Sequence, residues 1–81
     1  MLPKELKKEL PVHHTGIGVE NGQTYKLIRF KTPITLFING EIFLKNIKSI
    51  YYFENECYYS FRTQVETCTI QEDNIKTITS I

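Results

Sequence analysis

The sequence predicts a mainly β protein: a small antiparallel β-barrel of five to seven short strands that follows a short N-terminal α-helix. Of the 81 residues, 33 are Ile, Val, Thr, Tyr or Phe, the types that fit a pleated, half-buried sheet. Alanine, the best helix former, is absent. Turn-forming residues separate short apolar segments along most of the chain. A chain of this length forms a single domain, residues 1–81.

The first eleven residues predict the helix. Leucines recur every four residues along one face, at Leu2, Leu6 and Leu10. Pro3 suits a first helical turn, and Pro11 ends the helix. We expect this segment, 1–11, to cap one open end of the barrel. The alternative is a detachable helix that binds a partner or a membrane surface, and its mixed charge argues against a membrane.

Residues 12–81 predict strands, and the first of these form two hairpins. Asn21-Gly22 and Asn39-Gly40 are both the dipeptide that favours a two-residue type I′ turn. A strand over 24–30 follows the first turn. Thr32-Pro33 then predicts a corner, because proline cannot donate to a central ladder. Apolar segments over 34–38 and 41–45 flank the second turn and predict its two strands.

The second half of the chain continues this pattern. We expect strands over 47–53 and 57–63 around a turn at 54–56, and then a short strand over 67–70. A turn over 71–74 leads into a final strand, 75–81. The apolar residues of that strand suit it to pair with the sheet or with a neighbouring subunit.

The small size and the balanced charge limit the functions that this chain can have. A core this small supplies only about 3–5 kcal/mol of stability, so we expect a homo-oligomer. Ten Lys and Arg against nine Asp and Glu leave a net charge of +1, so no global field steers the chain to nucleic acid or membrane. No apolar run is long enough to span a bilayer, and the N-terminus lacks the apolar segment of a signal peptide. With only two cysteines, these features predict a cytoplasmic protein.

Residues 34–50, Ile-Thr-Leu-Phe-Ile-Asn-Gly-Glu-Ile-Phe-Leu-Lys-Asn-Ile-Lys-Ser-Ile, resemble the strand–turn–strand core of Sm-like proteins, with the bacterial Hfq group closest. In that family a short N-terminal helix precedes a strand that ends in hydrophobic-Asn-Gly, and a bent second strand follows. Residues 73–78 are similar to the turn and last strand of such barrels. The resemblance implies an Sm-like or SH3-like barrel with a tendency to form rings.

The residues with which this family reads RNA are not matched. Leu44 or Lys45 stands where a glycine is expected in the bent strand. Ile50 and Phe53 stand where the RNA-binding loop of Sm proteins has an aspartate and an asparagine. Acidic Glu72-Asp73 replaces the Tyr-Lys-His turn of Hfq. The resemblance therefore implies the fold and the assembly, but not the RNA-reading residues.

A glycine-rich stretch is the first candidate site. We expect the bare backbone at Gly16 and Gly18 to approach a phosphate closely, with His14 as a further donor. The stretch lacks the lysine of a P-loop, and no helix start follows it. The alternative is structural: a hairpin whose glycines lie beneath large cross-strand side chains such as Tyr25 and Leu27.

An aromatic cluster is the second candidate site. Six aromatic residues fall within eleven positions: Tyr51, Tyr52, Phe53, Tyr58, Tyr59 and Phe61. Strand alternation predicts that Tyr52 and Tyr58, with Arg62, lie on the outside of the barrel or at a subunit interface. Tyr and Arg stack on bases and are enriched in binding hot spots. A base-stacking surface and a second face buried by a neighbouring subunit are the two interpretations.

Basic residues concentrate in the middle of the chain: Lys26, Arg29, Lys31, Lys45 and Lys48. Acidic residues concentrate toward the C-terminus. If the middle strands share a face, cations such as Lys26 and Arg29 form a patch that contacts phosphate. The alternative is a set of solvated strand edges, where lysine prevents aggregation.

Catalysis and metal binding have little support in the sequence. His13 and His14 point to opposite faces of a strand, so they do not hold one ion together. Cys57 and Cys68 lack the spacing of a zinc site and are expected to be buried free thiols. No third group presents itself to orient a Cys–His pair. We therefore predict no metal, no cofactor and no enzymatic activity.

These features together predict a non-enzymatic, oligomeric protein that binds a nucleotide-type ligand or a short RNA. The predicted ligand contacts are His14, Gly16, Gly18, Lys26, Arg29, Tyr52, Tyr58 and Arg62. The alternative is a protein-interaction module, such as a small phage or mobile-element protein that inhibits or sequesters a host factor. The short length and the Ile/Lys/Asn-rich composition are compatible with that origin.

Overall fold

A single antiparallel sheet contains all the strands of the computed structural model, which describes residues 10–80. The elements in chain order are β1 (Val12–Glu20), β2 (Gln23–Ile38), β3 (Ile42–Phe53), β4 (Tyr58–Arg62), β5 (Thr67–Gln71), the 3-10 helix η1 (Glu72–Asn74) and β6 (Ile78–Ser80). The predicted mainly β class is confirmed. The helix predicted over 1–11 lies outside the described residues, except for its last two positions. No helix within residues 10–80 has the length and apolar character needed to cross a membrane.

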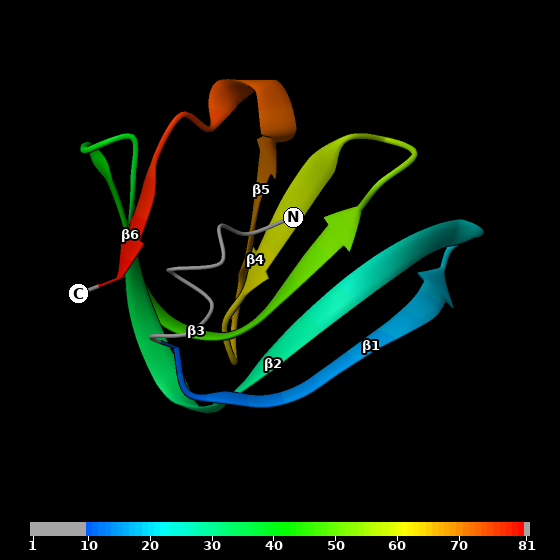
Figure 1. Ribbon diagram of the computed structural model, residues 1–81, viewed down its shortest axis with the longest axis horizontal. Helices are drawn as coiled ribbons and strands as arrows, with labels where there is room; N and C mark the ends of the chain where they lie inside the picture. Colours follow the sequence, from blue (N-terminus) through cyan, green and yellow to red (C-terminus); the bar gives the residue numbers. More distant parts are fainter. Residues whose placement is uncertain (1–9, 81) are drawn as a thin grey trace.

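The sheet is bent, but it does not close into a barrel. Neighbouring strands pair in the order β1-β2-β3-β4-β5, and β6 pairs with the last residues of β2. Figure 1 shows β2 as one long curved ribbon, with β1 along its first part and β6 beside its last part. Within residues 10–80 no ladder joins β5 to β1, so the predicted closed barrel is wrong. The physical reason is that β6 has only three residues and pairs with β2 alone, which leaves the outer edges of β1 and β5 open.

Both Asn-Gly dipeptides form hairpin turns, but the two turns differ in length. Asn21-Gly22 has φ angles of 52° and 78°, and the residues on either side pair directly, so this is the predicted two-residue turn. Asn39-Gly40 also has positive φ angles. Here, however, Ile38 pairs with Ile42, so the connection has three residues instead of two.

Two pairs of predicted strands merge into two long, bent strands. β2 continues through the predicted corner at Thr32-Pro33, and β3 joins the segments expected over 41–45 and 47–53. The predicted corner is present as a shift in the register between β2 and β3 rather than as a break. Proline fits there because a bulge interrupts the ladder, so its missing N–H leaves no bond unmade.

Both faces of the sheet bury side chains. The main core consists of Leu10, Ile28, Phe30, Ile34, Leu36, Ile38, Ile47, Ile50, Tyr52, Tyr59 and Phe61. The cross-strand register places a second, smaller group on the other face of β2, β3 and β4: Tyr25, Leu27, Tyr51, Phe53 and Tyr58. We call this group the second aromatic cluster. Its central ring, Phe53, is only 1% exposed.

The length of the turn between β3 and β4 decides which aromatic residues enter the main core. The sequence predicts a three-residue turn, whereas Phe53 pairs with Tyr58 and leaves four residues between them. Cys57, the additional residue, has a φ of 57°. A shift of one residue moves every side chain of a strand to the other face. Tyr52 therefore pairs with Tyr59 inside the core, and the prediction that Tyr52 lies outside is wrong.

Candidate functional site

The bend shared by β2 and β3 turns basic side chains outward. Across the bend, four residues of β2 (30–33) lie opposite one residue of β3, Lys48. Such a bulge bends the strand and re-aims its side chains. Arg29, Lys31 and Lys48 are all exposed around it, beside Pro33.

A second bulge lies further along β3. Asn46 has a φ of 60°, in the left-handed region that asparagine tolerates better than most residues. At this point β3 has one more residue than β2. Lys45 and Asn46 are consequently both exposed, although successive residues of a regular strand would point to opposite faces.

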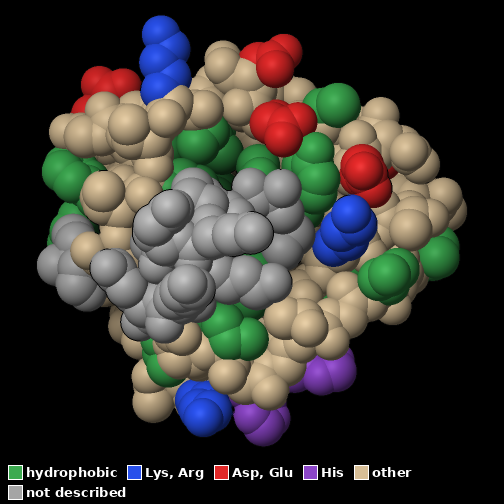
Figure 2. Space-filling model, viewed as in Figure 1, with side chains coloured by type: hydrophobic (Ala, Val, Ile, Leu, Met, Phe, Trp, Pro, Cys, Tyr) green, Lys and Arg blue, Asp and Glu red, His purple; other side chains and the backbone are tan. Residues whose placement is uncertain are grey.

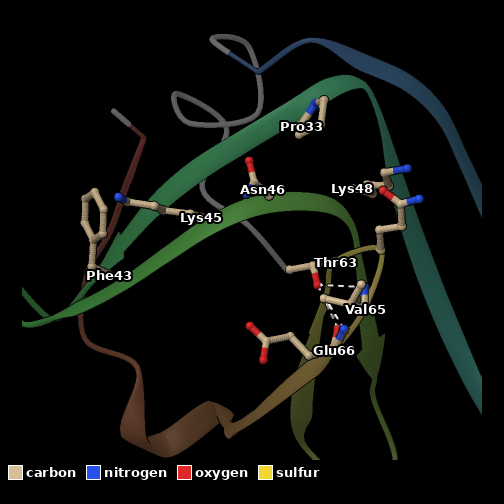
Figure 3. A pocket seen from close by; sticks show the side chains of 9 residues that line it. Pro33, Phe43, Lys45, Asn46, Lys48, Thr63, Val65 and Glu66 are labelled. Carbon is tan, nitrogen blue, oxygen red and sulfur yellow. Dashed lines mark hydrogen bonds between the residues drawn. The ribbon is translucent and has the colours of Figure 1, made fainter.

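An open groove of about 650 Å³ lies between this bend and the loop that joins β4 to β5. Figure 3 shows Pro33 and Asn46 on the side of the bend, with Thr63, Val65 and Glu66 on the side of the loop. The Thr63 hydroxyl fixes the loop because it accepts hydrogen bonds from the backbone N–H groups of Val65, at 3.2 Å, and Glu66, at 3.0 Å. The side chain of Val65 is 89% exposed, so the rim of the groove has an apolar element.

Phe43 lies at one end of the groove (Figure 3). Its ring packs edge-on against Phe37, with 6.0 Å between the ring centroids, yet Phe43 remains 50% exposed. Lys45 Nζ lies 5.2 Å from the centroid of the same ring. Because half of its surface is exposed, the Phe43 ring can stack on a base or another flat ring if the Lys45 side chain moves aside.

A second hollow continues from the groove, because Pro33 and Lys48 line both. We call the combined surface the basic groove. It carries four cations: Arg29, Lys31, Lys45 and Lys48. Among the described residues that line it, Glu66 is the single carboxylate. Within residues 10–80 none of the four cations forms a salt bridge. The surface therefore has an excess of positive charge that the described part of the chain does not neutralise.

Two other cations that the sequence suggests as ligand contacts are already paired. Lys26 Nζ lies 3.5 Å from a Glu54 carboxylate oxygen. Arg62 donates to both carboxylate oxygens of Glu20, at 2.7 and 2.9 Å, and its guanidinium lies 3.8 Å from the Tyr51 ring centroid. The hydrogen bonds between these two side chains lower the pKa of Glu20 and raise the pKa of Arg62. Arg62 thus bridges β4 to β1 across the second aromatic cluster.

The tyrosines suggested as ligand contacts also have internal partners. Tyr52 donates to the two carboxylate oxygens of Glu72 at 3.0 and 3.1 Å, and burial together with this contact raises the pKa of Tyr52 to about 12. Tyr58 donates to Gln23 Oε1 at 3.0 Å, and its ring stacks on Phe53 with centroids 4.7 Å apart. Both side chains hold the sheet together.

The glycines of β1 lie beneath other side chains of the hairpin. A Cβ added to Gly18 would lie 2.5 Å from Tyr25 Oη, and Tyr25 is its cross-strand partner. A Cβ added to Gly16 would lie 3.1 Å from Nε2 of His14. The structural interpretation is therefore confirmed for Gly18, whereas phosphate binding by this stretch stays a prediction. Figure 2 shows the histidine side chains at the rim of the molecule, where both are exposed.

Of the predicted ligand contacts, the structure brings Arg29 alone to the basic groove among residues 10–80. Phe43 and Val65 are surface features that were not predicted from the sequence. Lys45 and Lys48 were predicted to belong to the basic middle of the chain, but not to contact the ligand. The sequence shows that these two lysines are close together in the chain, but it does not show the bulges that place them on one surface.

The cysteines differ from the expectation. Cys57 is exposed in the turn between β3 and β4, and Cys68 is half-buried against the core. Both are free thiols. Within the described residues no three His, Cys, Asp or Glu side chains are close enough together to hold a metal ion.

No protein-family model, curated protein or solved structure matches this chain. The chemistry of the basic groove is therefore the basis on which a function can be inferred.

Proposed function

We propose that this chain is a non-enzymatic binding protein whose basic groove binds the phosphates of a short single-stranded RNA or of a nucleotide-type ligand. The observation that carries the proposal is the set of four cations on one surface, none of which forms a salt bridge within residues 10–80. Such a surface attracts a polyanion locally even though the net charge is only +1. Neutralising phosphates there releases counterions, which favours binding.

The groove supports a division of roles along its length. Arg29, Lys31 and Lys48 surround the bend and form the phosphate-contacting part. Phe43 lies at the other end, where its half-exposed ring stacks a base, with Lys45 beside it. The ligand is single-stranded in this proposal because stacking on Phe43 requires a base that is free of a duplex.

The segment that resembles Sm-like proteins forms part of this surface. Residues 34–50 form the end of β2 and most of β3, and this hairpin contributes Phe43, Lys45 and Lys48 to the groove. We also propose that the fold is related to the Sm-like or SH3-like barrels but has a sheet that does not close. Its ligand contacts then come from the bend and not from the positions that the family uses.

Fluorescence anisotropy with a labelled eight-nucleotide oligouridine and a matching oligoadenine tests this function. Arg29→Gln and Lys48→Gln each remove one cation from the groove, while Lys26→Gln removes one that is paired with Glu54 and serves as the matched control. Each groove variant should weaken binding about fivefold, since one charge-assisted contact contributes about 1 kcal/mol. Each groove variant should also make the negative slope of log affinity against log salt concentration less steep, by roughly 0.7.

Three other results of this experiment would each change the proposal. An equal loss in Lys26→Gln would place the ligand away from the groove. Binding that does not change with salt would exclude a phosphate-contacting mode and favour the protein-interaction alternative. ATP and free phosphate can each be added as competitors of the labelled oligonucleotide. If ATP displaces the oligonucleotide at a far lower concentration than free phosphate does, the ligand is of the nucleotide type and not an RNA segment.

A further inference from the structure

The outer edge of β1 is the longest unpaired strand edge among residues 10–80. Over its nine residues β1 contains no Lys and no Pro, two devices by which proteins commonly block edge pairing. Ile17 and Val19 are 76% and 68% exposed on it. The open edges of β5 and β6 are shorter, with five and three residues, and the exposed positions of β5 are polar: Thr67, Thr69 and Gln71. β1 is therefore the edge that most favours a partner strand.

The turn at Asn21-Gly22 determines which backbone groups of β1 are free. In a two-residue hairpin the residues that flank the turn exchange both of their hydrogen bonds, so Glu20 bonds to β2. The register is regular from His14 to Glu20, so every second residue from Glu20 backward also bonds to β2. The intervening residues, Thr15, Ile17 and Val19, direct their N–H and C=O groups to the open edge.

We propose that β1 pairs antiparallel with β1 of a second copy of this chain, across a twofold axis at Ile17. In this register Ile17 lies opposite the partner's Ile17, and Thr15 lies opposite the partner's Val19. The three resulting pairs all join residues whose backbone groups face the edge. They make six backbone hydrogen bonds and continue the sheet from one subunit into the other.

The side chains of β1 fit this register on both faces. Ile17 and Val19 of the two copies form a continuous apolar stripe on one face and lose much of their exposure to water. On the other face Gly16 lies opposite the partner's Gly18, and neither residue of this pair has a side chain; Tyr25 and His14 of the same subunit cover the two glycines. His14 lies opposite the partner's Glu20 at each end, where the Glu20 carboxylate is already held by Arg62 of its own chain. An axis at Gly16 would lose the contact between the two Ile17 side chains.

Sedimentation equilibrium of the full chain tests the surface. Ile17→Lys places two like charges at the axis, while Thr69→Lys introduces the same charge on the open edge of β5 and is the matched control. Both positions are exposed, so circular dichroism should show an unchanged fold. We expect a dimer whose dissociation constant rises at least tenfold in Ile17→Lys and stays unchanged in Thr69→Lys. A monomer at all concentrations, or a larger assembly that Thr69→Lys dissociates, would overturn the proposal.

Disulfide trapping tests the register. In a background of Cys57→Ser and Cys68→Ala, Ile17→Cys places two thiols on directly opposite residues, about 5.5 Å apart at Cα, which a disulfide spans. Val19→Cys separates them by four residues along the strand, or roughly 13 Å. Mild oxidation should crosslink Ile17→Cys at least tenfold faster than Val19→Cys. Equal rates, or a faster rate for Val19→Cys, would exclude the axis at Ile17.

Discussion

The second aromatic cluster and the basic groove both combine aromatic rings with basic side chains, but they differ in whether these side chains have partners within the protein. In and beside the cluster the charged and polar side chains bond to one another: Arg62 to Glu20 and Tyr58 to Gln23. In the groove Lys48 has no carboxylate partner within residues 10–80, and the Phe43 ring is half exposed. The region that most resembles a binding site in the sequence is thus a second core. The surface that suits a ligand lies where the backbone is irregular.

The largest expected effect is on the free energy of unfolding, when one aromatic ring is removed from each region. Phe53→Ala deletes a side chain that is 1% exposed between Tyr25 and Tyr58, and it should lower the free energy of unfolding by about 3–5 kcal/mol. Phe43→Ala deletes a half-exposed ring and should change that free energy by less than about 1 kcal/mol while weakening oligonucleotide binding. Urea denaturation and fluorescence anisotropy measure the two quantities.

The same two variants also show whether the two regions really differ. If Phe43→Ala were as destabilising as Phe53→Ala, the groove would be part of the core. If Phe43→Ala kept full affinity for the oligonucleotide, the stacking platform would lie elsewhere.

A smaller effect is expected at the glycine-rich strand. Gly18→Ala introduces a methyl group 2.5 Å from Tyr25 Oη, so the Tyr25 ring has to move away from its contacts in the second aromatic cluster. Overpacking of this kind should destabilise the protein by about 1–3 kcal/mol. The affinity of the folded variant for the oligonucleotide should stay unchanged, as measured by anisotropy. A loss of affinity at full stability would restore the phosphate-binding interpretation of this strand.

The smallest expected effect concerns acid stability. Hydrogen bonds from Arg62 lower the pKa of Glu20 in the folded protein below its value in the unfolded chain. The ionised carboxylate therefore stabilises the fold at any pH above the unfolded-state pKa. That contribution is lost as the pH falls through the folded pKa. Glu20→Gln should therefore be less stable than the natural chain at pH 7, and the difference should shrink as the pH approaches 3. Urea denaturation between pH 7 and pH 3 measures it, and a constant difference would show that the ion pair does not stabilise the fold.

Local sequence signals are sufficient to predict the class of the fold. Asn21-Gly22 specifies a tight turn because both of its residues tolerate positive φ, and the structure has both. The alternation of Ile34, Leu36 and Ile38 correctly marks the core face of β2. These features depend on near neighbours in the chain, and the sequence shows them directly.

The faces of the aromatic residues depend on a feature that the sequence does not display. Cys57 adopts a φ of 57°, an unusual value for a residue with a Cβ, and it thereby lengthens the turn by one residue. That single residue shifts β4 against β3, so Tyr52 pairs with Tyr59 instead of Tyr58, and both lie in the main core. The prediction of an exposed Tyr52 failed because register is set by the turn and not by composition.

The basic groove could not be predicted for a related reason. Its cations lie apart in the sequence, and the two bulges around Lys48 and Asn46 bring them to one surface. A bulge depends on how the long strands β2 and β3 bend over the core, which is a property of the whole sheet. The sequence shows that the middle of the chain is basic, and the structure shows where the charge gathers.

The most direct measurement of the central claim is a two-dimensional NMR titration of the ¹⁵N-labelled chain with the eight-nucleotide oligouridine. We expect the largest amide shifts at 29–33, 43–48 and 63–66, the segments that form the basic groove. Amides of the second aromatic cluster, such as those of Tyr51 and Tyr58, should move little. Binding by the basic groove is excluded if the largest shifts map to Gly16, Gly18 and that cluster, or if saturating oligonucleotide moves no amide in the groove.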